Sequence, residues 1–372
     1  MSVVVPPPCK VTLTSLLTSA EIHHSITVED VQAVIEAEKQ PRSLPRSSSA
    51  RSTGGSWSYD AYHDMEEIYE RMSWLVRSHP HLLSSEELGR THENRSIEVL
   101  IVREPGPHTK PVIWLDCGIH AREWITPPAC LYAVDKLVEM WETSDNLLSI
   151  FDFYVLPVVN PDGYVYTWGP DRFWRGNRNK NYTHNNCHGV DVNRNFPEFK
   201  DGSREEEVCS ITWRGDAPFS EPESRAIRDG LAKIIELYGP NKIAAYVSIH
   251  SFSQLWLSPY GYTYDKPVDY NDQLYVMHKT VEALKSNFGT EYTYGPASDL
   301  YLAPGISIDW TYDQMGIKYS FTPELRPKNT GTILGFALPP EQILDTVTET
   351  WTGLAAMALE IAPEFGKYCH LF

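Results

Sequence analysis

Two residues at the end of one apolar segment have the types and the spacing of metal ligands. His120 and Glu123 stand three positions apart, directly after the apolar run 112–119. In a turn or a short helical step, residues at this spacing lie side by side. One imidazole and one carboxylate would supply two of the three protein ligands of a catalytic zinc ion, which keeps a fourth position for water. The pattern therefore indicates metal-assisted hydrolysis.

A second histidine is needed to complete such a ligand set. His250 is the best candidate, because it ends the apolar segment 243–249 as His120 ends its own segment. In α/β sheets, ligand sites lie at the carboxyl ends of the strands. The alternative is two strand-end histidines with ordinary hydrogen-bond partners, and the spacing alone leaves it open.

A metal hydrolase also needs a base that takes a proton from water. Glu324 offers a carboxylate shortly after the apolar segment 317–321. The alternative is an exposed glutamate in a salt bridge, which the spacing alone favours. The role of base is therefore a hypothesis at this stage.

Arginine and asparagine are concentrated in the segments 171–179 and 189–196. A guanidinium group can hold a carboxylate through two parallel hydrogen bonds. In an acidic protein, such clusters indicate an anionic group on the substrate. The alternative is a set of solvated loop charges.

The elements that must position these residues can be read from the apolar pattern. Near-continuous apolar runs at 112–119, 153–159 and 243–249 predict strands that are covered on both faces. A helix is predicted over 127–142, with proline at its start, and another over 274–288. Strands that alternate with helices predict an α/β fold with a largely buried sheet.

Local end signals add detail to the predicted helices. Gly289 should end the helix that precedes it. Ser220 and Glu223 have the spacing of a capping box, which would open a further helix. A short helix is also predicted over 27–39, opened by Thr27.

Composition narrows the classes of partner. The 372 residues carry a formal net charge of −17, and such a surface repels phosphate backbones, so we expect no nucleic-acid partner. No run of 18 apolar residues is present, so we expect no membrane span. The first 20 residues lack the basic start and the unbroken apolar run of a signal peptide.

Six cysteines allow 15 pairings, so the residues alone fix none. Cys117 with Cys130 and Cys187 with Cys209 are plausible local pairs, and six free thiols are the alternative. Two glycosylation sequons point weakly to a secretory route. The Ser-, Arg- and Gly-rich segment 43–56 has the composition of an exposed, cleavable linker.

Nine motifs in order along residues 57–362 resemble those of the zinc carboxypeptidases of the pancreatic A/B type. They are DCGIHAREWITP, NPDGY, DRFWR, GVDVNRNF, SEPES, SIHSFSQLWLSPYGYT, LYLAPGISIDW, GIKYSFTPEL and GFALP. The resemblance implies an α/β fold: a single catalytic domain with a mixed, twisted central β-sheet covered by helices on both faces.

The resemblance assigns the metal chemistry residue by residue. It implies that His120, Glu123 and His250 bind one Zn²⁺ ion. Glu324 is then the general base that activates the zinc-bound water. Asp191 corresponds to the acid that orients a zinc-binding histidine.

The resemblance also implies how the substrate is held. Arg175 stabilises the oxyanion, and Asn193 with Arg194 binds the terminal carboxylate of the peptide. Tyr301 is the mobile tyrosine that closes over the substrate. The other substrate-binding residues that it implies are Arg122, Ser251, Phe252, Ile308 and Phe336.

The side-chain preference should depend on Ile308, which the resemblance places at the floor of the specificity pocket. An isoleucine leaves that floor apolar, because an unpaired charge there would be costly. We therefore expect removal of aromatic or large aliphatic C-terminal residues. The alternatives are B-type or mixed specificity, a non-catalytic peptide-binding relative, and a product that fails to fold. The further pocket residues are Leu257, Leu300, Ala303 and Thr322.

The chain departs from the family pattern near the active site. Phe252 stands where tyrosine is common, and Pro323 stands where phenylalanine is usual beside Glu324. The segment 326–331 also differs from the usual Arg-Asp-Thr-Gly. These departures concern the residues around the proposed base and the packing near Phe336.

Residues 1–51 are expected to be a partial, truncated pro-segment with an activation linker, in which residues 1–20 have no match. Residues 52–372 are then the catalytic domain, and a trypsin-like protease would cut at Arg51. Cys117–Cys130 and Cys187–Cys209 correspond to disulfides of the family, whereas Cys9 and Cys369 do not. We expect a secreted, monomeric enzyme that acts on peptide or protein C-termini.

Overall fold

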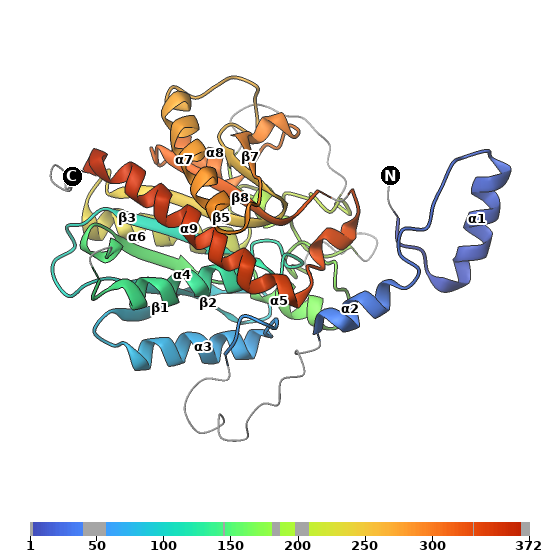
Figure 1. Cartoon of the computed structure of the whole chain (residues 1–372), viewed down its shortest axis with the longest axis horizontal. Coiled ribbons are helices and arrows are strands. Elements are labelled where there is room, and N and C mark those ends of the chain that lie inside the picture. The colour runs from blue at the N-terminus through green and yellow to red at the C-terminus, as the bar shows by residue number, and fades with distance from the viewer. Residues whose placement is uncertain are drawn as a thin grey trace.

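A computed structural model describes residues 3–39, 57–143, 146–180, 187–197, 208–329 and 331–365 of the chain (Figure 1). In this part of the chain, eight strands form one mixed sheet. Their order across the sheet is β1-β2-β4-β3-β5-β8-β6-β7. The strands are β1 (Leu83–Arg90), β2 (Ser96–Val102), β3 (Val112–Cys117), β4 (Asp152–Leu156), β5 (Ile243–Ser253), β6 (Leu255–Ser258), β7 (Thr293–Pro296) and β8 (Tyr319–Lys328).

The centre of the sheet is parallel and its sides are antiparallel. Strands β4, β3, β5 and β8 run parallel to one another. Strands β1 and β2 add an antiparallel pair at one side, and β6 runs antiparallel to β8 at the other. Every residue of β3 and of β4 is buried, as the continuous apolar runs predict.

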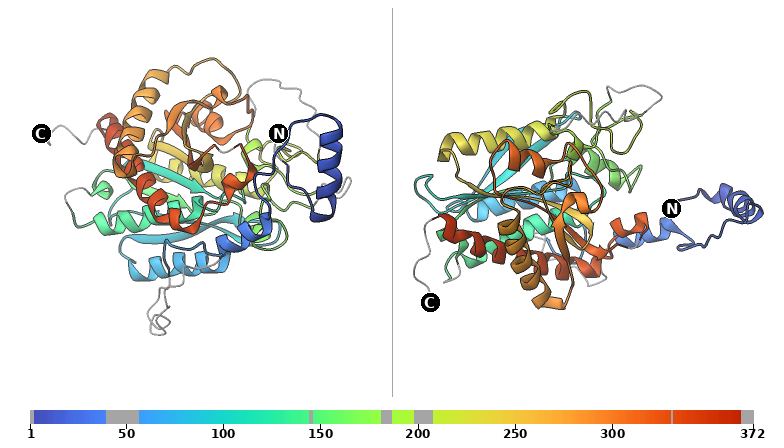
Figure 2. Two further views of the ribbon diagram at one scale, coloured as in Figure 1. Left: turned by 45° about the vertical axis from the view of Figure 1, so that its right-hand side comes forward. Right: turned by 90° about the horizontal axis from the view of Figure 1, so that it is seen from above.

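Helices cover both faces of the sheet (Figure 2). Side chains of α3 (Met65–Ser78), α4 (Thr126–Met140), α7 (Tyr270–Phe288) and α9 (Ile343–Ile361) join one apolar core. On the other face, α6 (Pro222–Tyr238) and α8 (Ser307–Asp313) join a second core. Ile113 and Trp114 show the division, because these neighbours on β3 point into different cores. The expected α/β fold, with a mixed sheet between helices, is confirmed.

Shorter elements connect these layers. They are α5 (Pro161–Trp168) and the 3₁₀ turns η3 (Leu147–Ser149), η5 (Val192–Arg194), η6 (Ala297–Asp299), η7 (Ile333–Phe336), η8 (Pro340–Gln342) and η9 (Ala362–Phe365). No helix in the described ranges is both long enough and apolar enough to cross a membrane.

The predicted helix ends were right at one place and wrong at two. Gly289 ends α7 in the left-handed conformation. Ser220 and Glu223 form no capping box: α6 begins at Pro222, so Glu221 is the N-cap residue, and the Ser220 hydroxyl donates to Glu221 instead. The helix α2 (Val31–Lys39) begins later than Thr27, because the Asp30 side chain accepts from the Ala33 backbone N–H.

Both local cysteine pairs are disulfide-bonded in the structure, so the alternative of six free thiols is wrong. Cys117–Cys130 joins the end of β3 to the first turns of α4, and Cys187–Cys209 joins two positions 22 residues apart in the chain. Cys9 is free and exposed. Cys369 lies outside the described residues.

The N-terminal segment contacts the rest of the described chain through α2. It comprises η1 (Pro7–Cys9), α1 (Lys10–Ser19) and α2, and α1 stands apart from the sheet and its helices (Figure 1). Near the end of α2, the buried Glu38 carboxylate accepts two hydrogen bonds from Arg172, at 2.6 and 2.7 Å. The proposed cleavage residue Arg51 lies outside the described residues.

Candidate active site

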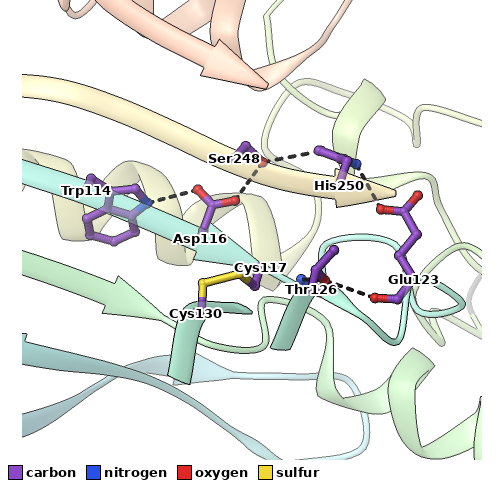
Figure 3. The surroundings of a disulfide bond; sticks show 9 residues. Trp114, Asp116, Cys117, Glu123, Thr126, Cys130, Ser248 and His250 are labelled. Carbon is purple, nitrogen blue, oxygen red and sulfur yellow. Dashed lines mark hydrogen bonds and ion pairs between the residues drawn. A yellow bond between two sulfur atoms is a disulfide. The ribbon is translucent and has the colours of Figure 1, made fainter. Parts of the chain in front are cut away.

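Three donor side chains meet where β3 and β5 end at the same edge of the sheet. The Nδ1 atoms of His120 and His250 are 3.0 Å apart. The Glu123 carboxylate lies 2.8 Å from His120 Nδ1 and 3.1 Å from His250 Nδ1. All three side chains are buried, and Figure 3 shows Glu123 and His250 facing one another. Two imidazoles and one carboxylate are the His₂Glu set of an open catalytic zinc site, so these residues fit zinc.

The outer nitrogen of His120 is bound to Asp191. His120 Nε2 lies 3.1 Å from Asp191 Oδ1, and Arg175 Nε donates to Asp191 Oδ2 at 2.8 Å. Burial acts to raise the pKa of Asp191, but Arg175 and His120 outweigh it and lower that pKa well below its usual value. A charged Asp191 therefore fixes the ring of His120 with Nδ1 turned toward the other donors.

Glu324 lies beside the metal-binding set because of strand register. It pairs with His250 where β5 and β8 run parallel. Burial, helped by the nearby Glu123 carboxylate and opposed first by His250, raises the pKa of Glu324 to about 8. Its side chain lines the same cavity as the donors, so it is not an exposed surface glutamate.

A cavity of about 430 Å³ joins the donors to the predicted substrate residues. Every predicted catalytic, metal-binding and substrate-binding residue lines it, and Asp191 lies behind His120. The lining therefore includes Arg122, Arg175, Asn193, Arg194, Ser251, Phe252, Tyr301, Ile308 and Phe336 together with the donors and Glu324.

One part of the cavity wall can bind an anion. Arg175 and Arg194 line it with Asn193, and Arg194 is 7% exposed, so neither arginine is a solvated loop charge. Arg194 donates to the Asn193 carbonyl at 2.8 Å and to the Tyr301 hydroxyl at 3.3 Å. The Asn193 amide oxygen accepts from the Ser307 N–H at 2.9 Å, so the donor side of the amide is its N–H₂ group, which lies 3.3 Å from His250 Nε2.

The mouth of the cavity is aromatic and cationic. The Arg122 guanidinium lies 4.1 Å from the centre of the Phe336 ring, which in turn packs edge-on against Phe252. Burial, with the neighbouring Arg175 cation, lowers the pKa of Arg122 to about 10. Tyr301 is 58% exposed, so its ring can move without disturbing the core.

Another part of the wall is apolar. Ile308 is 1% exposed in the first turn of α8, and the predicted Leu257, Leu300, Ala303 and Thr322 line the same cavity. Sequence reasoning missed Ala297, Ile306, Ser253 and the residues 329 and 331–333. The only earlier signal for the last group was the unusual segment 326–331. No pattern singles out the first two, because they stand in turns.

A second group with metal-binding side chains lies where α6 begins. It consists of His92, Glu221 and Glu223. The Asn177 amide donates to both carboxylates, at 2.7 and 2.8 Å, and His92 Nε2 is 2.9 Å from Glu221. These contacts tie the β1–β2 turn to α6.

The fold and the donor set define a metal-dependent hydrolase, and comparisons give its family. The family model "Zinc carboxypeptidase" matches residues 68–353, and the model "Carboxypeptidase activation peptide" matches residues 1–38. The expectation that residues 1–20 have no match in the family was therefore wrong. The chain belongs to the zinc carboxypeptidase family. It is a metallocarboxypeptidase, an enzyme that acts at the C-termini of peptides, and zinc is the metal of its family.

Named relatives include carboxypeptidases with both A and B designations. The chain is 42% identical to carboxypeptidase A2 of Rattus norvegicus over 91% of this chain and 78% of the relative. It is 39% identical to carboxypeptidase B2 of Homo sapiens over the same two shares. The crystal structure of thrombin activatable fibrinolysis inhibitor aligns with a TM-score of 0.85 and 35% identity, over 96% of this chain and 87% of that one.

Proposed function

We propose that this enzyme prefers peptides with an aromatic or large aliphatic C-terminal residue, and that Glu324 is its general base. The observation that carries the preference is the buried, uncharged Ile308 in the apolar part of the cavity wall. A Lys or Arg side chain in that part would lose its hydration without gaining a counter-ion.

The acidic residue next to Ile308 in the chain does not change this argument. Asp309 follows Ile308 in the chain, but its two oxygens accept hydrogen bonds from the backbone N–H groups of Gly261 and Tyr262. Burial raises the pKa of Asp309 to about 7. Its carboxyl group is thus committed to the backbone and does not line the cavity.

The substrate would be oriented by its terminal carboxylate. Arg194 and the amide N–H₂ of Asn193 supply donors in the fork geometry that a carboxylate accepts. The Tyr301 hydroxyl already contacts Arg194 and can close on the bound peptide. The side chain of the last residue then extends toward Ile308.

The reaction needs a metal, a base and a cation near the scissile carbonyl. His120, Glu123 and His250 would hold zinc, which when bound polarises the carbonyl group and makes water more acidic. Glu324 takes the proton of the attacking water and returns it to the leaving amine. Arg175 stabilises the negative charge that develops on the carbonyl oxygen.

The N-terminal segment would act as a pro-segment. We propose that residues 1–51 precede a catalytic domain of residues 52–372, and that a trypsin-like protease cuts at Arg51. The activation-peptide match supports the first part of this proposal. A monomeric, extracellular enzyme is consistent with this organisation and with the two disulfides.

A peptide panel tests the proposal. Peptides that differ only in a C-terminal Phe, Leu, Lys or Glu are incubated with the trypsin-treated, zinc-loaded protein, and the released residue is measured. We expect release of Phe and Leu, abolished by a chelator. Release of Lys in their place would contradict the Ile308 argument and leave the catalytic assignment standing. No release from folded, zinc-loaded protein would favour a peptide-binding relative without activity.

A further inference from the structure

The outer nitrogen of His250 needs a hydrogen-bond acceptor. The Nδ1 atom of this histidine faces the other two donors, at 3.0 Å from His120 and 3.1 Å from Glu123. A neutral imidazole that gives Nδ1 to a metal carries its proton on Nε2. His250 is buried, and a buried N–H without a hydrogen-bond partner destabilises the folded protein.

Two side chains lie close to His250 Nε2, and one of them can accept a hydrogen bond from its N–H group. Asn193 Nδ2 and Ser248 Oγ are each 3.3 Å away. The Asn193 amide is turned so that its oxygen accepts from the Ser307 N–H, so the group that faces His250 is an N–H₂ donor. The Ser248 hydroxyl can accept, and this leaves it as the partner of the Nε2 proton.

Asp116 fixes the direction of that hydroxyl. Ser248 Oγ donates to Asp116 Oδ1 at 2.7 Å, and the other carboxylate oxygen accepts from Trp114 Nε1 at 2.9 Å. Trp114, Asp116 and Ser248 are all completely buried. Because the serine proton is directed to Asp116, its lone pair is directed to His250. Figure 3 shows Trp114, Asp116, Ser248 and His250 linked one after another by hydrogen bonds across two strands.

Strand geometry produces this arrangement. Ser248 and His250 are two residues apart on β5, so their side chains emerge on the same face. Asp116 on β3 pairs directly with Ser248 in the parallel register. Two neighbouring central strands therefore hold Asp116, Ser248 and His250 in hydrogen-bonding positions.

We propose that Ser248 and Asp116 are positioning residues for His250. They hold its ring and its Nε2–H tautomer, and thereby tighten zinc binding. Asp191 has the corresponding contact with His120 at the other histidine. The proposal rests on the role of His250 as a zinc ligand, which is part of the proposed function.

Zinc affinity tests this role without any measure of activity. The dissociation constant of the full chain is measured by competition with a chelator. For Ser248→Ala we expect zinc binding about 10- to 100-fold weaker than for wild type. Ser248→Thr keeps the hydroxyl and should restore most of the affinity. The visible spectrum of the cobalt-substituted Ser248→Ala protein should also change, because the His250 ring is less well held.

A matched control separates this effect from a general loss of stability. Ser320 is another completely buried strand serine, and its hydroxyl bonds to Ile317 and Thr311 instead of to a zinc ligand. Ser320→Ala should bind zinc as wild type does. Asp116→Asn should weaken zinc binding less than Ser248→Ala, and the two changes together should not be additive. If Ser248→Ala does not fold, the zinc affinities of Asp116→Asn and Ser320→Ala are compared instead.

The outcomes distinguish this proposal from the proposed function. Wild-type affinity in Ser248→Ala, or an equal loss in Ser320→Ala, would overturn the positioning role alone. If His250→Ala bound zinc as tightly as wild type, the ligand assignment itself would be wrong and the positioning role would fall with it.

Discussion

At the scale of single residues, the proposed function assigns separate roles in substrate recognition and catalysis to three side chains. In the proposed function, Ile308 would set the polarity of the pocket, Arg194 would bind the substrate carboxylate and Glu324 would transfer the proton. Each stands on a different element, and each lines the same cavity. Changes at these positions should therefore alter separate properties of the reaction.

Ile308→Asp should reverse the side-chain preference. A carboxylate in the pocket would pair with a C-terminal Lys and would be unpaired beside Phe. We expect kcat/KM for a Phe-ended peptide to fall at least about 100-fold while that for a Lys-ended peptide rises. Ile308→Val, which keeps the pocket apolar, is the control. An unchanged ratio of the two substrates would show that Ile308 does not set the preference.

Arg194→Gln should weaken recognition of the terminal carboxylate. Loss of a charge-assisted bond in a buried site predicts a fall in kcat/KM on the order of 100-fold for a free-acid peptide. The same peptide with a C-terminal amide has no carboxylate for Arg194 to bind. The much lower rate of this amidated peptide should therefore change little in the variant. Equal losses for both peptides would mean that Arg194 acts through the structure of the site.

At the scale of elements, buried polar contacts fix how the strands and helices meet. Asp116 and Ser248 join β3 to β5, and Asn177 with Glu223 joins a loop to α6. One oxygen of the completely buried Glu223 carboxyl group has no hydrogen-bond partner among the described residues. This position should influence stability without touching the active site.

Glu223→Gln should reduce the pH dependence of stability. Burial raises the pKa of Glu223 from 4.5 to about 7 in the folded protein. Between those values the folded state holds a proton that the unfolded state releases, so this group's stabilisation is lost as pH rises from about 4.5 to 7. Relative to the variant, wild type should lose at most about 3 kcal/mol across that window.

Urea unfolding of both proteins at pH 4.5, 6 and 8 measures this difference. Because His92 and Glu221 are present in both proteins, their titration cancels to first order. A stability difference between variant and wild type that is the same at all three pH values would refute the assignment to Glu223.

At the scale of the whole molecule, the sequence predicts the fold and the location of the site well. Buried parallel strands leave continuous apolar runs, and the polar residues that interrupt them, His120 and His250, stand at the strand ends. The carboxyl ends of these parallel strands meet at one edge of the sheet, so the sequence alone predicts that His120, Glu123 and His250 lie close together.

Features that depend on register or on turns could not be predicted. Ser248 and Asp116 are 132 positions apart, and only the β3–β5 register brings them together. The capping prediction at Ser220 was wrong because Pro222 sets the start of α6 one residue later than the pattern implies. Local patterns do not contain that information.

Zinc removal should lower the stability of the whole molecule. A ligand that binds only the folded state stabilises it by about 4 kcal/mol when present at 1,000 times its dissociation constant. For a domain of this size, we expect Tm to fall by roughly 6 °C after chelation. Calorimetry with and without chelator checks this, and His250→Ala should show a much smaller shift. An equal shift in the variant would place the stabilising metal elsewhere.

Glu324→Gln removes the proposed base and leaves the proposed zinc ligands His120, Glu123 and His250 in place. The trypsin-treated variant and wild type are loaded with zinc and compared for binding and for release of Phe from one peptide. We predict one zinc ion and similar peptide affinity in both proteins, with release at least about 100-fold slower in the variant. Release at the wild-type rate from zinc-loaded Glu324→Gln would contradict the account.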